Sequence, residues 1–192
     1  MSCDNCERLY PGKMIRIKRN KKWGQDYFCE DCERRLIMND FYGDKIARWD
    51  TYFHNICTAV ATKSPCLSRQ IGAILVRDNS IVSTGFNGPA RGYFHCEGQC
   101  PRKVAGFKSG EGLLHCPAAH AEGNCIANAA RIGASTVGST LYMNCVIPCK
   151  DCMILLVNAG IKSIVIDDVK PYHEMSIDIA LRGKITLRKF KL

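Results

Sequence analysis

The chain has 192 residues, of which 46% are apolar and 23% charged, so it can bury one core domain of ordinary size but not two large ones. Its net charge of +9 favours an anionic partner, either a nucleotide or a nucleic acid. No apolar run approaches the roughly 20 residues of a membrane helix and the N-terminus lacks a signal-peptide core, so we expect a cytoplasmic protein without a membrane partner.

Residues 1–36 form a unit by composition, because two Cys-x-x-Cys pairs bracket a stretch rich in lysine and arginine. Four thiolates in two such turns suit the closed tetrahedral site of a structural zinc. We therefore predict a zinc ribbon with a short hairpin between the two turns. Its expected zinc ligands are Cys3, Cys6, Cys29 and Cys32.

From Lys45 apolar residues recur at helical spacing, which predicts a helix to about Thr62 after a connector at 37–43. Two β-rich runs on either side of Arg77-Asp78-Asn79 predict a hairpin. Residues 86–116 are too irregular for a regular element and too long for a passive connector, so we expect a functional loop. Helices and strands then alternate: helices at 120–132, 149–159 and 175–181, and strands at 141–146, 163–167 and 184–187.

Two of these predicted helices begin with metal-ligand residues. His120-Ala121-Glu122 opens the first, and Cys149 and Cys152 lie in the first turn of the second. Cysteines three residues apart share a helix face, and the positive end of the helix dipole favours their thiolates. With His120 they would give zinc three protein ligands, which leaves a fourth position for water, as in catalytic sites.

Glu122 lies beside these expected ligands but is not needed as one. At the end of a helix axis its carboxylate can face the bound water and transfer that water's proton to a substrate. The arrangement H-x-E followed by P-C-x-x-C is the signature of zinc nucleobase deaminases. The alternative interpretation is a purely structural zinc site with three ligands, beside which Glu122 has no catalytic role.

Residues 45–168 resemble deoxycytidylate (dCMP) deaminases in the order and spacing of their motifs, whereas the ribbon has no counterpart in the resemblance. The resemblance implies an α/β, cytidine deaminase-like three-layer fold over 45–192, with a central mixed sheet between helices. It also implies Zn2+-dependent hydrolysis of dCMP to dUMP and ammonia, a homo-oligomer, and dCTP or dTTP as effectors. The motifs that carry it are Trp49–Phe53, Cys66–Ala73, Gly85–Gly88, His120–Asn124 and Pro148–Cys152.

The same resemblance implies further site residues. Asn87 and Ala121 are expected to contact the substrate, although an Asn-Gly pair after a strand is also ordinary turn chemistry. The expected phosphate-binding residues are Lys63, Ser64 and Arg69, with a solvated polar loop as the alternative. The expected regulatory positions are Gly85, Phe86, Gly88 and Arg131, although a cation near a helix C-terminus also complements the helix dipole. Phe86 and Cys125 stand where the family usually has tyrosine and alanine, which puts the regulatory behaviour in doubt.

The long loop carries a second group of metal-ligand residues. Members of the family with a similar arrangement hold a structural zinc there, and three cysteines with one histidine would complete it. Thiols without a metal are the alternative. We expect His95 rather than His115 to join Cys96, Cys100 and Cys116, and we expect Cys57, Cys66 and Cys145 to be small buried apolar residues.

Two other functions compete with dCMP deamination. A nucleic-acid cytosine or adenine deaminase could use the ribbon to hold a polynucleotide, but residues 1–36 carry 9 basic and 6 acidic groups, a net charge of only +3. A binding protein with a degenerate deaminase core is disfavoured because all three zinc ligands and the glutamate are present.

Overall fold

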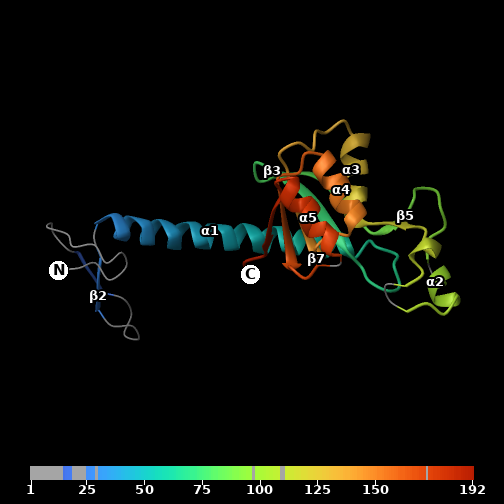
Figure 1. The fold of residues 1–192 in the computed structure, drawn as a ribbon, viewed down its shortest axis with the longest axis horizontal. Helices are drawn as coiled ribbons and strands as arrows, with labels where there is room; N and C mark the ends of the chain where they lie inside the picture. Colours follow the sequence, from blue (N-terminus) through green and yellow to red (C-terminus); the bar gives the residue numbers. More distant parts are fainter. Residues whose placement is uncertain (1–14, 19–24, 29, 97, 109–110, 172) are drawn as a thin grey trace. The chain divides into compact units, whose positions relative to one another are not determined.

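The computed structural model describes residues 15–18, 25–28, 30–96, 98–108, 111–171 and 173–192 (Figure 1). The chain divides into two compact units, Met1–Trp49 and Asp50–Leu192. Within the described residues no helix combines the length and the apolar character that crossing a lipid bilayer requires.

The first unit contains an antiparallel pair of strands, β1 (Ile15–Lys18) and β2 (Gln25–Phe28), where we expected a hairpin. Helix α1 (Glu30–Ala61) follows and continues through 37–43, so the predicted connector there was wrong. That stretch contains no proline, and its single glycine costs a helix only about 1 kcal/mol. The expected ligands Cys3, Cys6 and Cys29 lie outside the described residues and Cys32 lies in the first turn of α1, so the ribbon and its boundary stay a prediction.

The second unit is built on a five-stranded mixed sheet, as the sequence predicted, in the order β4-β3-β7-β8-β9. The first three strands are antiparallel neighbours, and the last three are parallel neighbours. The hairpin between β3 and β4 turns at Asp78 and Asn79, whose positive φ angles of 52° and 58° suit a type I′ turn. The strands are β3 (Gly72–Arg77), β4 (Ser80–Phe86), β7 (Thr140–Val146), β8 (Ser163–Asp168) and β9 (Thr186–Lys189).

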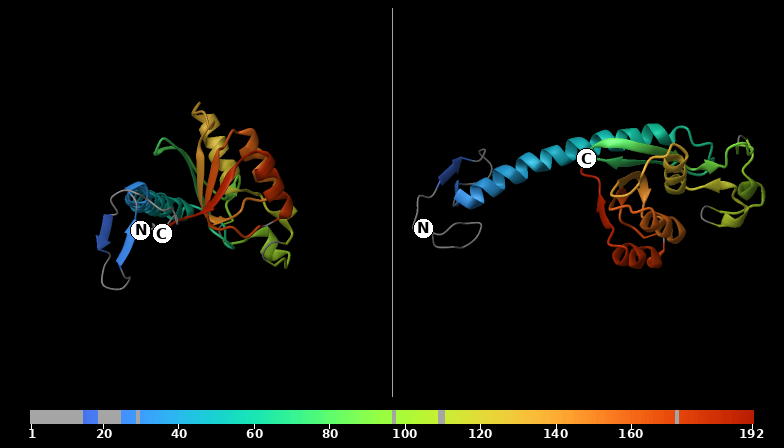
Figure 2. Two further views of the ribbon diagram at one scale, coloured as in Figure 1. Left: turned by 60° about the vertical axis from the view of Figure 1, so that its left-hand side comes forward. Right: turned by 90° about the horizontal axis from the view of Figure 1, so that it is seen from above.

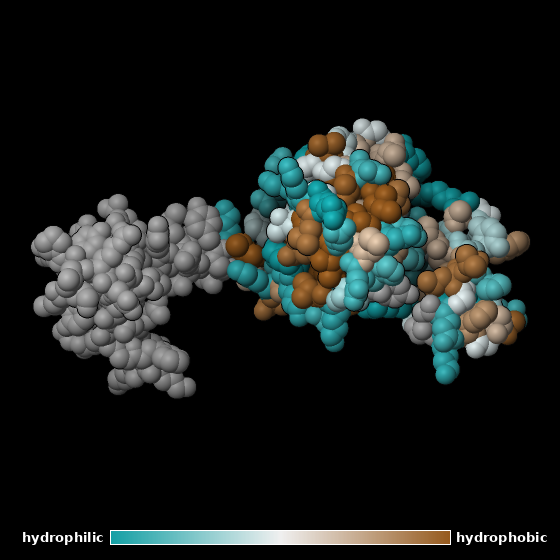
Figure 3. All heavy atoms as spheres, in the orientation of Figure 1, coloured by the Kyte–Doolittle hydropathy of each residue, from teal (hydrophilic) through white to brown (hydrophobic). Residues whose placement is uncertain are grey.

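Helices cover both faces of this sheet (Figure 2). On one face α3 (Ala121–Arg131), α4 (Lys150–Asn158) and α5 (Glu174–Arg182) enclose the main core, which contains Leu141 and Met143. Tyr142 points to the other face, where the centroid of its ring lies 4.6 Å from the ring centroid of Phe53 on α1. The three-layer prediction is therefore confirmed. Apolar side chains stay exposed on the solvent side of α4 and α5, among charged ones (Figure 3): Ile154, Leu155, Met175 and Leu181.

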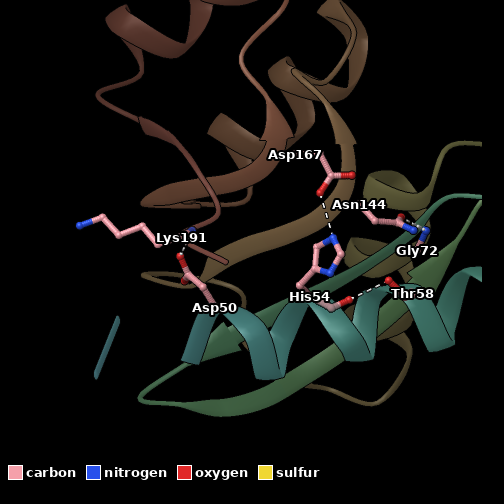
Figure 4. Close-up of polar contacts among 7 residues, drawn as sticks. All are labelled: Asp50, His54, Thr58, Gly72, Asn144, Asp167 and Lys191. Carbon is pink, nitrogen blue, oxygen red and sulfur yellow. Dashed lines mark hydrogen bonds and ion pairs between the residues drawn. The ribbon is translucent and has the colours of Figure 1, made fainter. Parts of the chain in front are cut away.

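Polar contacts attach the C-terminal half of α1 to the sheet (Figure 4). Asp50 is fully buried, receives two hydrogen bonds from Arg188 at 2.6 and 2.9 Å, and a third from the Lys191 backbone at 2.8 Å. His54 Nε2 lies 3.1 Å from Asp167 Oδ1. These contacts fix α1 and, with it, the start of the loop that leads from α1 into β3.

The long loop after β4 is closed at its base and partly ordered by short elements. The two-residue strands β5 (Gly88–Pro89) and β6 (Ala118–Ala119) pair antiparallel, which brings the end of β4 next to the start of α3. Between them lie a four-residue helix, α2 (Pro101–Val104), and a 3-10 turn, Leu113–His115. The loop is thus a small structured lobe beside the ends of β4 and α3.

Candidate active site

Two helix N-termini bring together the three expected metal ligands His120, Cys149 and Cys152, here called the helix-end cluster. His120 and Cys149 are the N-cap residues of α3 and α4, both with extended backbone. The His120 Nδ1 atom lies 3.4 Å from the sulfur of Cys149 and 3.4 Å from that of Cys152. All three ligand atoms lie within 4.8 Å of one another, so this cluster can hold a metal ion.

Close packing of α3 on the sheet positions His120. A Cβ atom added to Gly85 on β4 would lie 2.5 Å from both the Ala121 carbonyl oxygen and the Cys125 amide nitrogen. Only glycine therefore permits this approach. Gly85, which we expected to be a regulatory residue, has this packing role in the structure.

The thiols of the helix-end cluster are poised for metal binding. The pKa of Cys149 is lowered to about 4, first because Cys152 donates a hydrogen bond to its thiolate and then because of His120. The same hydrogen bond, with burial, raises the pKa of Cys152. The pair therefore holds one thiolate and one thiol, and a cation can displace the remaining proton.

This donor set fits zinc. One imidazole nitrogen and two sulfurs are ligands that zinc prefers, and three protein ligands leave the open position of a catalytic site. Nδ1 of His120 faces both sulfurs, so it is the nitrogen available to the ion.

Glu122 lies in the first turn of α3 and is only 5% exposed. Burial raises the pKa of its carboxyl group, and a hydrogen bond to its own backbone amide partly offsets this effect. A carboxyl group with a raised pKa can both accept and donate a proton near neutral pH.

A cavity of about 200 Å³ opens beside the helix-end cluster and Glu122. Of the expected substrate-binding residues, Asn87, Ala121 and Arg69 line it. Lys63 and Ser64 do not line it: Lys63 is exposed, and Ser64 is buried with its hydroxyl donating to Asn87 at 2.7 Å.

Asn87 connects three parts of the chain around this cavity. Its Oδ1 atom accepts hydrogen bonds from the Ser64 hydroxyl and from the Ile71 amide at 2.8 Å, and its Nδ2 atom donates to the Arg69 carbonyl at 2.8 Å. Both acceptor positions and one of its two donors are therefore used. One N–H of Asn87 remains for a substrate.

Arg102 also lines the cavity, and the sequence analysis missed it. It comes from α2, inside the long loop, and is only 9% exposed. The loop was expected to be functional, but no spacing rule says which side chain of an irregular segment points inward.

The remaining regulatory expectations fall on positions with backbone contacts or at the surface. The Phe86 carbonyl accepts a hydrogen bond from Asn124 at 2.7 Å, and Gly88 pairs with Ala119. Arg131 is exposed in the last turn of α3. Their regulatory role stays a prediction.

Four cysteines line a second, smaller cavity of about 20 Å³ and are here called the loop cluster: Cys66, Cys96, Cys100 and Cys116. Burial, followed by the nearby Cys100, Cys116 and Cys66, raises the pKa of Cys96. His95 is exposed and does not line this cavity, and the ring of His115 stacks on that of Phe107 at 5.2 Å. Half-buried Cys66, which we expected to be a small buried apolar residue, lines this cavity beside the other three cysteines. Among the described residues only the helix-end cluster meets the 4.8 Å spacing, so the loop sulfurs are more widely spaced.

Comparison with known proteins places this site in a family. Residues 47–167 match the family model of the cytidine and deoxycytidylate deaminase zinc-binding region. The chain is 37% identical over 119 residues to a deoxycytidylate deaminase of Schizosaccharomyces pombe, covering 61% of this chain and 36% of that protein. It is 36% identical over 122 residues to one from Mycobacterium phage D29, covering 61% and 92% of the two chains.

A solved structure shows the same fold. The dCMP deaminase of cyanophage S-TIM5, crystallised in complex with dCMP and dUMP, is 25% identical with a TM-score of 0.58, and the match covers 72% of this chain and 93% of that one. The chain spans less than half the length of the Schizosaccharomyces pombe relative but most of the phage proteins. Since the family model spans well over half of the sequence, the chain belongs to the cytidine and deoxycytidylate deaminase family.

Proposed function

We propose that this protein catalyses the zinc-dependent hydrolysis of dCMP to dUMP and ammonia. The observation that carries the proposal is the convergence of His120, Cys149 and Cys152 beside the buried carboxyl group of Glu122, with His120, Cys149 and Glu122 lining one cavity. The names of the relatives support dCMP as the substrate.

His120, Cys149 and Cys152 would hold the zinc ion. When bound, zinc acts as a Lewis acid and lowers the pKa of a coordinated water towards 7. The protein's own contribution is to orient three ligands from two helix ends, with a low pKa at Cys149 that favours the thiolate.

Glu122 would serve as the proton shuttle. Its carboxylate accepts a proton from the attacking water and delivers it to N3 of the cytosine ring. The water oxygen bonds to C4, the C4–N4 bond breaks, and the amine leaves as ammonia after a second proton transfer, so dCMP and water give dUMP and ammonia. The raised pKa of Glu122 supports this dual role, because the group can hold the proton between the two transfers.

Asn87 and the first turn of α3 would position the nucleoside. Asn87 has one N–H left after its three protein hydrogen bonds, which suits a sugar hydroxyl or a base carbonyl. Ala121, fully buried at the cavity wall, excludes water from the base. Arg69 supplies positive charge at the cavity for a phosphate.

The loop cluster would hold a second, structural metal ion. Four cysteines from two loops around one small cavity support this assignment, and Cys66 then replaces His95 as the fourth ligand. A four-cysteine site is closed, so it would brace the loop rather than take part in chemistry.

Assembly and regulation complete the proposal. The exposed apolar side chains on α4 and α5 support a homo-oligomer, because patches of this kind mark contact surfaces. Regulation by dCTP or dTTP, with Arg131 as a contact, rests on the resemblance to the family. The zinc ribbon at 1–36 would be an accessory module that takes no part in the chemistry.

Side-by-side assays with dCMP, dCTP, deoxycytidine and single-stranded DNA test the proposal. We expect turnover of dCMP and much weaker turnover of the other three. If only the polynucleotide is deaminated, the protein is a nucleic-acid editor, and if nothing is deaminated by zinc-loaded protein, the deaminase assignment fails.

A further inference from the structure

Among the residues that the structure describes, no carboxylate forms an ion pair with the buried cation Arg102. Arg102 is only 9% exposed. Arg188, which is more exposed at 35% of its side chain, is held by the carboxylate of Asp50 at 2.6 Å. A buried charge is costly unless an opposite charge compensates it, so Arg102 is suited to bind an anion that no described carboxylate supplies.

The guanidinium group of Arg102 is oriented by the loop that carries it. Its Nε atom donates to the Glu111 carbonyl at 2.6 Å, and Nη2 donates to the Lys108 carbonyl at 2.9 Å. An arginine has five N–H donors, so three remain. Two parallel N–H groups of this kind match the oxygens of a phosphate.

The position of Arg102 links it to the substrate. It lines the same cavity as His120 and Glu122, and Arg69 lines that cavity as well. Its neighbour Lys103 donates to the Leu67 carbonyl at 2.9 Å, which ties α2 to the loop that carries Arg69. Two arginines from separate segments therefore border the space beside the reacting groups.

We propose that Arg102 binds the 5′-phosphate of the nucleotide and makes the enzyme specific for a nucleoside monophosphate. This inference rests on the proposed deamination of dCMP, and it transfers the main phosphate contact from Lys63 and Ser64 to α2. Arg69 contributes a second positive charge to the same phosphate.

Arg102→Gln is the principal test, with kcat/KM measured for dCMP and for deoxycytidine. We expect kcat/KM for dCMP to fall by about 10- to 100-fold, the effect of losing hydrogen bonds to a charged group. The value for deoxycytidine should stay within about twofold, because that substrate has no phosphate to lose. The matched control, Arg91→Gln, removes an exposed arginine that does not line the cavity and should leave both values unchanged.

The outcomes separate this inference from the proposed function. If the unaltered enzyme deaminates neither substrate, the proposed function fails. If the unaltered enzyme prefers dCMP and Arg102→Gln keeps that preference, the role of Arg102 is overturned. Equal losses on both substrates, or loss of metal from the loop cluster, would mean that Arg102 only braces the loop or compensates its thiolates.

Two further measurements test the proposal even if the Arg102→Gln variant does not fold. Arg102→Lys keeps a charge but not the paired N–H groups, so it should lower the preference for dCMP partly and leave deoxycytidine unaffected. A crystal structure of the unaltered protein with dUMP should place the phosphate within hydrogen-bond distance of Arg102. A phosphate held elsewhere would overturn the proposal.

Discussion

The helix-end cluster and the loop cluster gather metal-ligand residues by different means. In the helix-end cluster, regular secondary structure positions the residues: α3 and α4 each begin at a cluster residue, and Gly85 lets α3 approach the sheet. In the second, the ligands come from the loop before β3 and from the long loop after β4, which are joined by hydrogen bonds rather than by one element. The packing of the helices on the sheet sets the positions of the ligands in the helix-end cluster. The positions of the ligands in the loop cluster depend instead on the contacts that fold the loop.

Glu122→Gln breaks the chemistry beside the helix-end cluster without altering the loop cluster. We expect kcat for dCMP to fall by about 10²- to 10⁴-fold, because an amide cannot transfer the proton, while zinc content stays unchanged. Steady-state kinetics with metal analysis checks this. Glu174→Gln, an exposed glutamate at the start of α5, is the control and should be fully active. Near-normal turnover by the zinc-loaded Glu122→Gln variant would contradict the assignment of Glu122 as the proton shuttle.

Asn87→Ala tests the connection between the two clusters, because Asn87 holds the loop that carries both Cys66 and Arg69. It removes three hydrogen bonds and leaves the half-buried amide of Ile71 without its acceptor. We expect a loss of about 2–3 kcal/mol in unfolding free energy, measured by urea denaturation, with a lower kcat/KM for dCMP.

Asn128→Ala is the control for that experiment, since Asn128 also donates to a strand carbonyl but through a solvent-exposed hydrogen bond. The Asn128→Ala substitution should lower the unfolding free energy by less than about 1 kcal/mol. Equal destabilisation by the two substitutions would show that Asn87 has no special part in holding the loop.

Cys66→Ser and His95→Ala together decide the fourth ligand of the loop cluster. Cys66→Ser should remove one metal ion per chain and lower kcat/KM for dCMP by about tenfold, since Cys66 and Arg102 line both cavities. His95→Ala should keep the metal and the activity, because His95 lies outside the small cavity. The opposite pattern of metal content would restore His95 as the ligand.

Deleting residues 1–36 should have the smallest effect on catalysis. Asp50, whose carboxylate binds Arg188, and residue 47, where the family match begins, both lie beyond this deletion, so we expect kcat/KM per folded subunit to stay within about twofold. A longer deletion that removes Asp50 leaves Arg188 without its carboxylate and should destabilise the protein by about 3–5 kcal/mol. A folded, zinc-loaded 1–36 deletion without activity would place part of the site in the ribbon.

The sequence alone determined the helix-end cluster and most of the sheet. Apolar periodicity predicted helices within a few residues of α3 and α4, and the H-x-E and P-C-x-x-C spacings identified the three residues that the fold brings together. These inferences succeed because short-range spacing fixes which side chains share a helix end. The connector prediction at 37–43 was wrong because this stretch has no proline and only one glycine, so nothing in it ends a helix.

Only the tertiary structure decided which distant side chains meet. Cys66 joins Cys96, Cys100 and Cys116, and Arg102 reaches the cavity that Lys63 and Ser64 do not. Both results depend on how loops far apart in the sequence pack together, through hydrogen bonds such as that from Lys103 to Leu67. Regular elements repeat a local geometry that a sequence pattern reveals, but an irregular loop takes its shape from contacts with other parts of the chain, and no local pattern records them.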